Sequence, residues 1–306
     1  ERGYMTQQVV NALTLGSVIA LFALGYSMVY GILTILNFAH GEVFMIGAFM
    51  GYYTQKLFIV DDQLTANPIL IILLSLLVAM VVCGALAVTI EFVAYRPLRQ
   101  AARLAPLISA LAMSVLLRNI MGVITKFRVR PISTDLLLPQ RWALHIGDTT
   151  VAASRYVIIG VTVISLIALE VFMARTKAGK AMRACAQDRE AASFMGISVN
   201  GIISLTFLVG AVMAGIGGIM TGLYYTQIDF AMGFSLGMKA FTAAVLGGIG
   251  NLRGAVLGSF ILATAETLGS YYISFTYRDV IAFAILITIL LFKPSGLLGK
   301  PIPVKV

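Results

Sequence analysis

The sequence of 306 residues is 59% hydrophobic and only 11% charged, whereas a soluble domain typically carries about a quarter charged residues. A soluble protein of this composition would lack the polar groups needed to cover its outside, so we expect a lipid environment. The formal net charge is +9. The basic residues gather between apolar runs, as orientation in a membrane requires, and we therefore expect no nucleic-acid partner.

Uncharged runs such as 69–90 and 201–228 are long enough to cross the hydrocarbon core as helices. Because the runs are continuous, they favour helices over the alternating strands of a barrel. The sequence predicts an all-α polytopic membrane protein, a single transmembrane domain over 1–306 with about eight or nine transmembrane or re-entrant helices. In chain order, the predicted segments are roughly 9–30, 42–59, 69–94, 106–124, 155–173, 201–225, 239–250, 255–275 and 279–292.

Two further features of the sequence concern a signal peptide and the shortest predicted segment. No basic region followed by a short apolar core and a small-residue cleavage site is visible, so we expect no secretory signal peptide in this sequence. The segment 239–250 is too short to cross alone as a straight helix. It is either re-entrant or a continuation of the glycine-rich stretch before it.

Lysine and arginine predict the orientation, because they are enriched in cytoplasmic loops. The connections 95–105 and 174–200 and the C-terminal tail are basic, so we place all three in the cytoplasm. The connections 60–68 and 226–238 are acidic and are placed outside. By the same count 125–155 also falls outside, although it carries five basic residues. The residues used inside are Arg96, Arg99, Arg103, Arg175, Lys177, Lys180, Arg183, Arg189, Lys293, Lys300 and Lys305, and those used outside are Asp61, Asp62 and Asp229.

The stretch TILNFAHGE at 34–42 interrupts an apolar region with Asn37, His40 and Glu42. One interpretation is a capped turn near the membrane face, since an acid in the first turn of a helix is favoured. The other is a hinge that lines a polar pathway, because irregular backbone at membrane depth is tolerated inside protein or beside water. Asn37, His40 and Glu42 are therefore candidate pathway residues, together with the glycines Gly247, Gly248 and Gly250.

Other glycines recur four residues apart, at Gly47 and Gly51 and at Gly218 and Gly222. Such residues line one face of a helix, and close helix packing is the simpler interpretation of each pair. Buried charges are the remaining polar features. Glu91, Glu170 and Lys239 lie near predicted segment ends and could reach the interface, whereas Glu266 lies deep and is expected to bond to a neighbouring helix or, less favourably, to relay protons.

The loop at about 174–200 is polar and lacks helix breakers before Gly196, so it predicts one or two short cytoplasmic helices around Arg183. Glu190, Ala191 and Ala192 are followed three residues later by Gly196, which is the start of the EAA-x3-G coupling motif of ABC importer permeases. In that motif a short helix fits a groove on an ATPase, and the glycine ends the helix. The Leu-Pro pair that usually completes the motif is absent.

Enzyme activity is not expected. The sequence contains no Gly-x4-Gly-Lys followed by Ser or Thr, so it lacks the P-loop route to ATP. No Ser-centred elbow and no His pair at metal-ligand spacing are present, so no metal site is expected. The cysteines Cys83 and Cys185 are expected to be free thiols.

Three stretches together resemble the LivH-type permeases of high-affinity branched-chain amino-acid ABC importers. They are GYSMVYGILTILNFAHGEVFMIGAF, RACAQDREAASFMGIS and GMKAFTAAVLGGIGNLRGAVLG, and the similarity extends to the C-terminal PSGLLGKP. The resemblance implies a multi-pass permease of the bacterial inner membrane with a LivM-type second permease, two ATPases that bind ATP and Mg, and an external binding protein. This chain would then bind no cofactor itself, and its substrate would be Leu, Ile or Val.

Three alternatives remain open. A permease for urea or short amides would look similar. A secondary transporter or channel would need no ATPase, and the 174–200 loop argues against it. A membrane enzyme would need a catalytic cluster, which the sequence does not offer.

Overall fold

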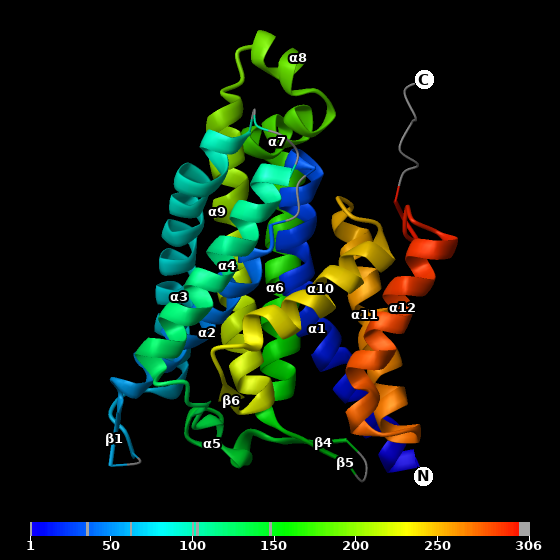
Figure 1. Ribbon diagram of the computed structural model, residues 1–306. Helices are drawn as coiled ribbons and strands as arrows, with labels where there is room; N and C mark the ends of the chain where they lie inside the picture. Colours follow the sequence, from blue (N-terminus) through cyan, green and yellow to red (C-terminus); the bar gives the residue numbers. More distant parts are fainter. Residues whose placement is uncertain are drawn as a thin grey trace.

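The computed structural model describes residues 2–34, 37–61, 63–99, 101, 104–146 and 149–299. Long helices dominate this part of the chain and run mostly side by side between two ends of the molecule (Figure 1). These helices are α1 (Arg2–Leu33), α2 (Ala39–Lys56), α3 (Pro68–Ile90), α4 (Leu104–Thr125), α6 (Ala153–Arg175), α9 (Val199–Tyr225), α10 (Met232–Gly247), α11 (Leu252–Tyr272) and α12 (Arg278–Phe292).

Shorter elements form the connections between these helices. Two hairpins pair β1 with β2 and β4 with β5, and an antiparallel pair joins β3 to β6, which is distant in sequence. Helix α3 continues through a π-helix, η1, into the 3-10 helix η2. The short elements are β1 (Ile59–Val60), β2 (Gln63–Leu64), η1 (Glu91–Tyr95), η2 (Arg96–Leu98), β3 (Arg130–Pro131), α5 (Thr134–Leu137), η3 (Gln140–Trp142), β4 (Leu144–Ile146), β5 (Thr149–Val151), α7 (Lys177–Gln187), α8 (Arg189–Phe194), β6 (Gln227–Ile228) and η4 (Phe275–Tyr277).

Each of the nine predicted segments corresponds to one long helix, but the expected count of eight or nine membrane helices is not confirmed as a count of crossings. Within the described residues, five helices are long and apolar enough to cross a membrane. A sixth candidate is the pair α10 and α11, which is bent by 117° at a short break. Helix α12 has 15 residues, and it spans about 22 Å at the α-helical rise, which is short for a crossing.

The predicted sidedness agrees with the arrangement of the loops. Figure 1 shows α7 and α8 at the same end as the start of α4 and the end of α12, while β1, α5, β4 and β5 lie at the other end with the N-terminus. The pairing of β3 with β6 places the 226–228 region at this second end as well. Which end faces the cytoplasm stays a prediction, and Asp62, Arg103, Lys300 and Lys305 lie outside the described residues.

The centre of the molecule is built around α1 and α9. Nearly all of the apolar window of α1 is buried, whereas only 22% to 33% of the windows of α3, α4 and α6 is buried, as expected for helices that face lipid. Glycine allows α2 to cross α9 closely: a Cβ on Gly47 would lie 2.7 Å from the Cα of Gly215. A Cβ on Gly218 would lie 2.7 Å from the amide nitrogen of Ala48. Helix packing therefore accounts for these glycines.

Candidate functional site

The predicted interruption at 34–42 is a break between α1 and α2. Helix α1 ends at Leu33, and Thr34 follows in a left-handed conformation with φ of 53°. This conformation is costly for a β-branched residue and stops the helix. Helix α2 then begins at Ala39, and no side chain caps its N-terminus. The structure thus supplies a turn at this point without a capping side chain.

The three polar residues of this stretch, Asn37, His40 and Glu42, are buried, and each is at most 4% exposed. The side chain of Asn37 accepts a hydrogen bond of 2.7 Å from the hydroxyl of Tyr95. The His40 ring packs against the rings of Phe22 and Tyr26, and it occupies the space that a side chain on Gly25 would fill. Gly25 precedes the end of α1 by eight residues, or about 12 Å along the helix axis. Because His40 in the first turn of α2 packs beside Gly25, α2 begins beside the middle of α1 and not beside its end.

Glu42 is held by α4. Its Oε1 accepts hydrogen bonds from Ser114 at 3.0 Å and from Arg118 at 3.4 Å. Its Oε2 has no hydrogen-bond partner and packs against Gly233 in the first turn of α10. The carboxylate therefore sits in the first turn of its own helix and beside the first turn of another, where both helix dipoles favour a negative charge.

The glycines at 247–250 form the sharp turn between α10 and α11. Gly248 and Gly250 have φ values of +105° and +90°, which other residues adopt with strain. The 295–299 segment packs against this turn, and the amides of Leu297 and Leu298 donate to the carbonyls of Leu246 and Gly247. Gly250 packs against Gly31 near the end of α1, whereas His40 packs against Gly25, six residues or about 9 Å away along that helix. The structure therefore does not bring the two predicted sets into one site.

The 174–200 loop contains two short helices, α7 and α8, at one end of the molecule (Figure 1). Asp188 caps α8 by accepting from the amides of Glu190 and Ala191. Glu190 and Ala191 are exposed, whereas Ala192 is buried. Arg183, on α7, donates to the carbonyl of Met173 near the end of α6. The expectation of one or two helices in this loop is confirmed.

Gly196 ends α8 as the motif predicts. Its φ is +78°, its amide donates to Ser193, and the amide of Ile197 donates to Ala192, which is the Schellman arrangement. Just before it, Phe194 and Met195 are 82% and 83% exposed. This exposed apolar pair was not predicted from the sequence, although two large apolar residues beside the glycine of the motif were a signal for it.

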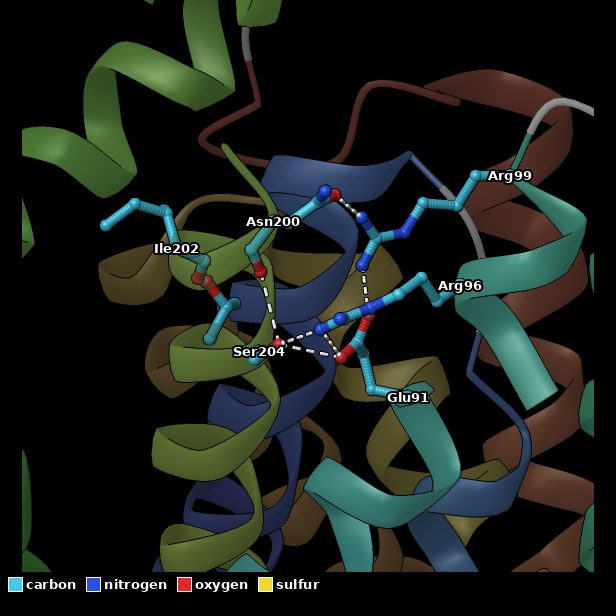
Figure 2. Close-up of polar contacts among 7 residues, drawn as sticks. Glu91, Arg96, Arg99, Asn200, Ile202 and Ser204 are labelled. Carbon is cyan, nitrogen blue, oxygen red and sulfur yellow. Dashed lines mark hydrogen bonds and ion pairs between the residues drawn. The ribbon is translucent and has the colours of Figure 1, made fainter. Parts of the chain in front are cut away.

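A second polar cluster joins the end of α3 to the start of α9 (Figure 2). Glu91 is fully buried and accepts from Arg96 at 3.0 Å, from Ser204 at 2.7 Å and from Arg99. Arg99 also donates to the side chain of Asn200 at 2.5 Å. The expectation that Glu91 reaches the interface is wrong, because partners on η2 and α9 hold its charge inside. This cluster was not found from the sequence.

Of the other two charges expected near the interface, Lys239 is buried and Glu170 is partly exposed. Lys239 is buried and pairs with Glu266 at 3.0 Å and with Asp279 at 2.9 Å, so the prediction for Lys239 is also wrong. Glu266 has the neighbouring-helix partner that was expected. Glu170 is half exposed and pairs with Arg253 at 2.5 Å. Through its two ion pairs, Lys239 ties α10 to both α11 and α12.

Two groups beside the loop have shifted pKa values. Burial lowers the pKa of Arg99, and the nearby charges of Arg96 and Arg189 lower it further, while Glu91 opposes the shift. Burial raises the pKa of the Cys185 thiol, and the Arg189 charge opposes that shift. Arg189 thus lies near both groups. A thiol with a raised pKa is a poor nucleophile, and both cysteines are buried and free.

The described helices and the exposed helical loop define a polytopic helical membrane protein of the permease type. The family model described as "Branched-chain amino acid transport system / permease component" matches residues 8–290. The chain therefore belongs to the family of branched-chain amino-acid transport permeases.

Similar proteins from several bacteria cover almost the whole chain. The high-affinity branched-chain amino acid transport system permease protein LivH of Escherichia coli K12 is 42% identical over 305 residues, which are 97% of this chain and 96% of the relative. LivH of Salmonella typhimurium LT2 is 41% identical over the same coverage. BraD of Pseudomonas aeruginosa is 42% identical over 298 residues, 96% of each chain. No solved structure matches the chain.

Proposed function

We propose that this chain is the permease subunit of an ATP-driven importer that carries branched-chain amino acids across the bacterial inner membrane. The observation that carries the proposal is the family match over 8–290, with relatives at about 40% identity over nearly their full length. A LivM-type permease would complete the conduit, two ATPases would bind ATP and Mg, and an external protein would deliver Leu, Ile or Val. The chain itself acts as a transport subunit and not as an enzyme.

The geometry of the loop supports the ATPase partners. A short helix capped by Asp188 and closed by Gly196 presents Phe194 and Met195 to the outside. A rigid apolar tip of this kind suits a groove on another subunit, because aromatic and Met side chains are enriched at interface cores. Glu190, Ala191 and Ala192 would set the position of this tip, and Arg183 would hold α7 against α6.

The break between α1 and α2 supports a pathway at Asn37, His40 and Glu42. A zwitterionic amino acid loses much hydration on entering lipid, so a conduit must offer polar groups to its charged ends. In transporters, broken helices supply such groups at their termini. The first turns of α2 and α10 meet at Gly41 and Gly233, beside Glu42. In the described chain this place is closed, so transport would require α2 and α10 to separate, with the Gly247–Gly248–Gly250 turn as the hinge of α10.

Reconstitution of the complete importer in liposomes tests the substrate. With the native binding protein and ATP, labelled leucine should accumulate and labelled urea should not. Uptake of urea in place of leucine would favour a urea or amide permease. Leucine uptake that survives the removal of ATP would contradict the importer and favour a secondary transporter.

The loop is tested by a double substitution, Glu190→Ala with Gly196→Val. The valine is strained at a φ of +78°, and it should displace the α8 tip. We expect the permease to reach the membrane at its normal level but to lose the ATPase subunits in a pull-down. The matched control is Gly160→Ala on α6, where an added Cβ has nothing within 4 Å, and the control should retain the ATPases. Equal recovery of ATPases with both variants would contradict the role of the loop.

A further inference from the structure

The end of α1 is fastened to α8 by one side chain. The last carbonyls of a helix have no partner within that helix. The carbonyl of Ile32 accepts hydrogen bonds from Nε of Arg189 at 3.1 Å and from its Nη2 at 2.5 Å. Arg189 is the first residue of α8 and lies 157 residues further along the chain. A guanidinium fork on one carbonyl therefore holds α8 to the helix end that precedes the break.

The opposite side of the break is fastened to η1. The hydroxyl of Tyr95 donates to Asn37, and the Tyr95 ring lies 5.3 Å from that of Phe207 on α9. Tyr95 is 2% exposed, so its hydroxyl has little access to water as an alternative partner. Glu91, the first residue of η1, accepts a hydrogen bond from Ser204, which lies on α9 like Phe207. The break is thus anchored to η1, and η1 is anchored to α9.

The residues that make these two sets of contacts lie on the two sides of Gly196 in the sequence. Before the glycine, Arg189 binds the end of α1. After it, Asn200 and Ser204 bind Arg99 and Glu91 (Figure 2). A Cβ placed on Gly196 would meet no atom within 4 Å, so the turn itself is unpacked, whereas Ala192 on α8 is buried. A displacement of α8 relative to α9 would therefore change the separation between the end of α1 and η1.

We propose that Arg189 is a positioning residue for transport, which transmits movement of α8 to the end of α1 and so changes the geometry of the break that Asn37, His40 and Glu42 follow. Tyr95 is its counterpart and holds the far side of the break still. The proposal rests on the proposed function, because movement of α8 requires the ATPase partners. It goes beyond that function by assigning the mechanical link inside the chain, which nothing in the coupling motif itself contains.

The first test uses Arg189→Gln in the reconstituted importer. Glutamine removes the charged fork from the carbonyl, and charge-assisted hydrogen bonds are the stronger ones. We expect leucine uptake to fall about tenfold or more, as loss of such a bond allows, while the ATPases stay bound and still hydrolyse ATP. Arg189→Lys, which keeps a donor, should restore part of the uptake. The control is Lys180→Gln, an equal loss of charge at an exposed position of α7, and it should transport normally.

The second test measures movement directly. Spin labels are placed at Thr34→Cys, after the end of α1, and at Val93→Cys, on η1, and both positions are exposed. Cys83 and Cys185 are first replaced by serine. Trapping the ATPases with ATP and vanadate should shift the distance between the labels in the Lys180→Gln background. In the Arg189→Gln background the shift should disappear. If Arg189→Gln fails to accumulate, Tyr95→Phe decides, since it removes only the hydroxyl and should lower uptake in the same assays.

The outcomes separate the link from the function on which it rests. Normal uptake in Arg189→Gln, or a label shift that persists in it, would overturn the link. Loss of the ATPases from Arg189→Gln would also overturn it, because Arg189 would then belong to the docking surface. No label shift in the control would show that the break does not move. Failure of the unsubstituted complex to bind ATPases would overturn the proposed function itself.

Discussion

At the scale of single residues, the buried charge of Lys239 joins α10 to two neighbouring helices. It lies between Glu266, which is 1% exposed, and Asp279, which is 63% exposed. We predict that Lys239→Met lowers the free energy of unfolding by about 3 kcal/mol, because it leaves Glu266 buried without its partner. Asp279 contributes less, since exposed ion pairs are weak. Thermal unfolding of the detergent-solubilised chain measures the change.

A second substitution separates charge from packing at the same place. Lys239→Met combined with Glu266→Met removes both charges and fills the space with apolar groups, so it should recover most of the lost stability. If the double variant is as unstable as Lys239→Met alone, the lysine stabilises the helices through packing and not through its charge.

At the scale of helices, the crossing of α2 over α9 depends on glycine. A Cβ on Gly218 would collide with the backbone of α2 at Phe44 and Ala48. We predict that Gly218→Ala destabilises the chain by about 2 kcal/mol, because overpacking forces the backbones apart. The melting temperature in detergent and the amount of protein in the membrane both report this loss.

The control for that crossing is Gly160→Ala on α6. Nothing lies within 4 Å of the added methyl group, and alanine favours a helix by about 1 kcal/mol over glycine. This variant should match or exceed the parent in melting temperature. A loss at Gly160 as large as that at Gly218 would mean that glycine acts through general helix flexibility and not through close packing.

At the scale of the whole molecule, local apolarity was enough to predict where the long helices form, and long-range contacts were needed for the rest. The segment 239–250 was too short for a straight crossing. Most of it forms the second half of α10, and the chain then bends sharply where Gly247 packs against Gly254 of α11. The sequence pattern contained the glycines but not the partner that each one meets.

In the candidate site, too, local features were predictable from the sequence and long-range contacts were not. Gly196 was predictable because the end of a short helix is a local event, and its positive φ follows from residue type. The contact of Arg189 with Ile32 and that of Glu91 with Ser204 join residues more than 100 positions apart. Charge patterning alone placed Glu91 and Lys239 at the interface, since a single sequence does not show which buried partner neutralises a charge.

The orientation of the whole chain yields the last prediction. Basic loops lie at the end that carries α7 and α8, so this end should face the cytoplasm. In a chain without its native cysteines, Ser193→Cys on α8 and Thr65→Cys beside β2 occupy exposed positions at opposite ends. A membrane-impermeant maleimide should label Thr65→Cys in spheroplasts and should label Ser193→Cys only after the inner membrane is opened. The reverse pattern would invert the topology, and an inverted α8 could not reach cytoplasmic ATPases, so one labelling experiment tests both the orientation and the coupling role of the loop.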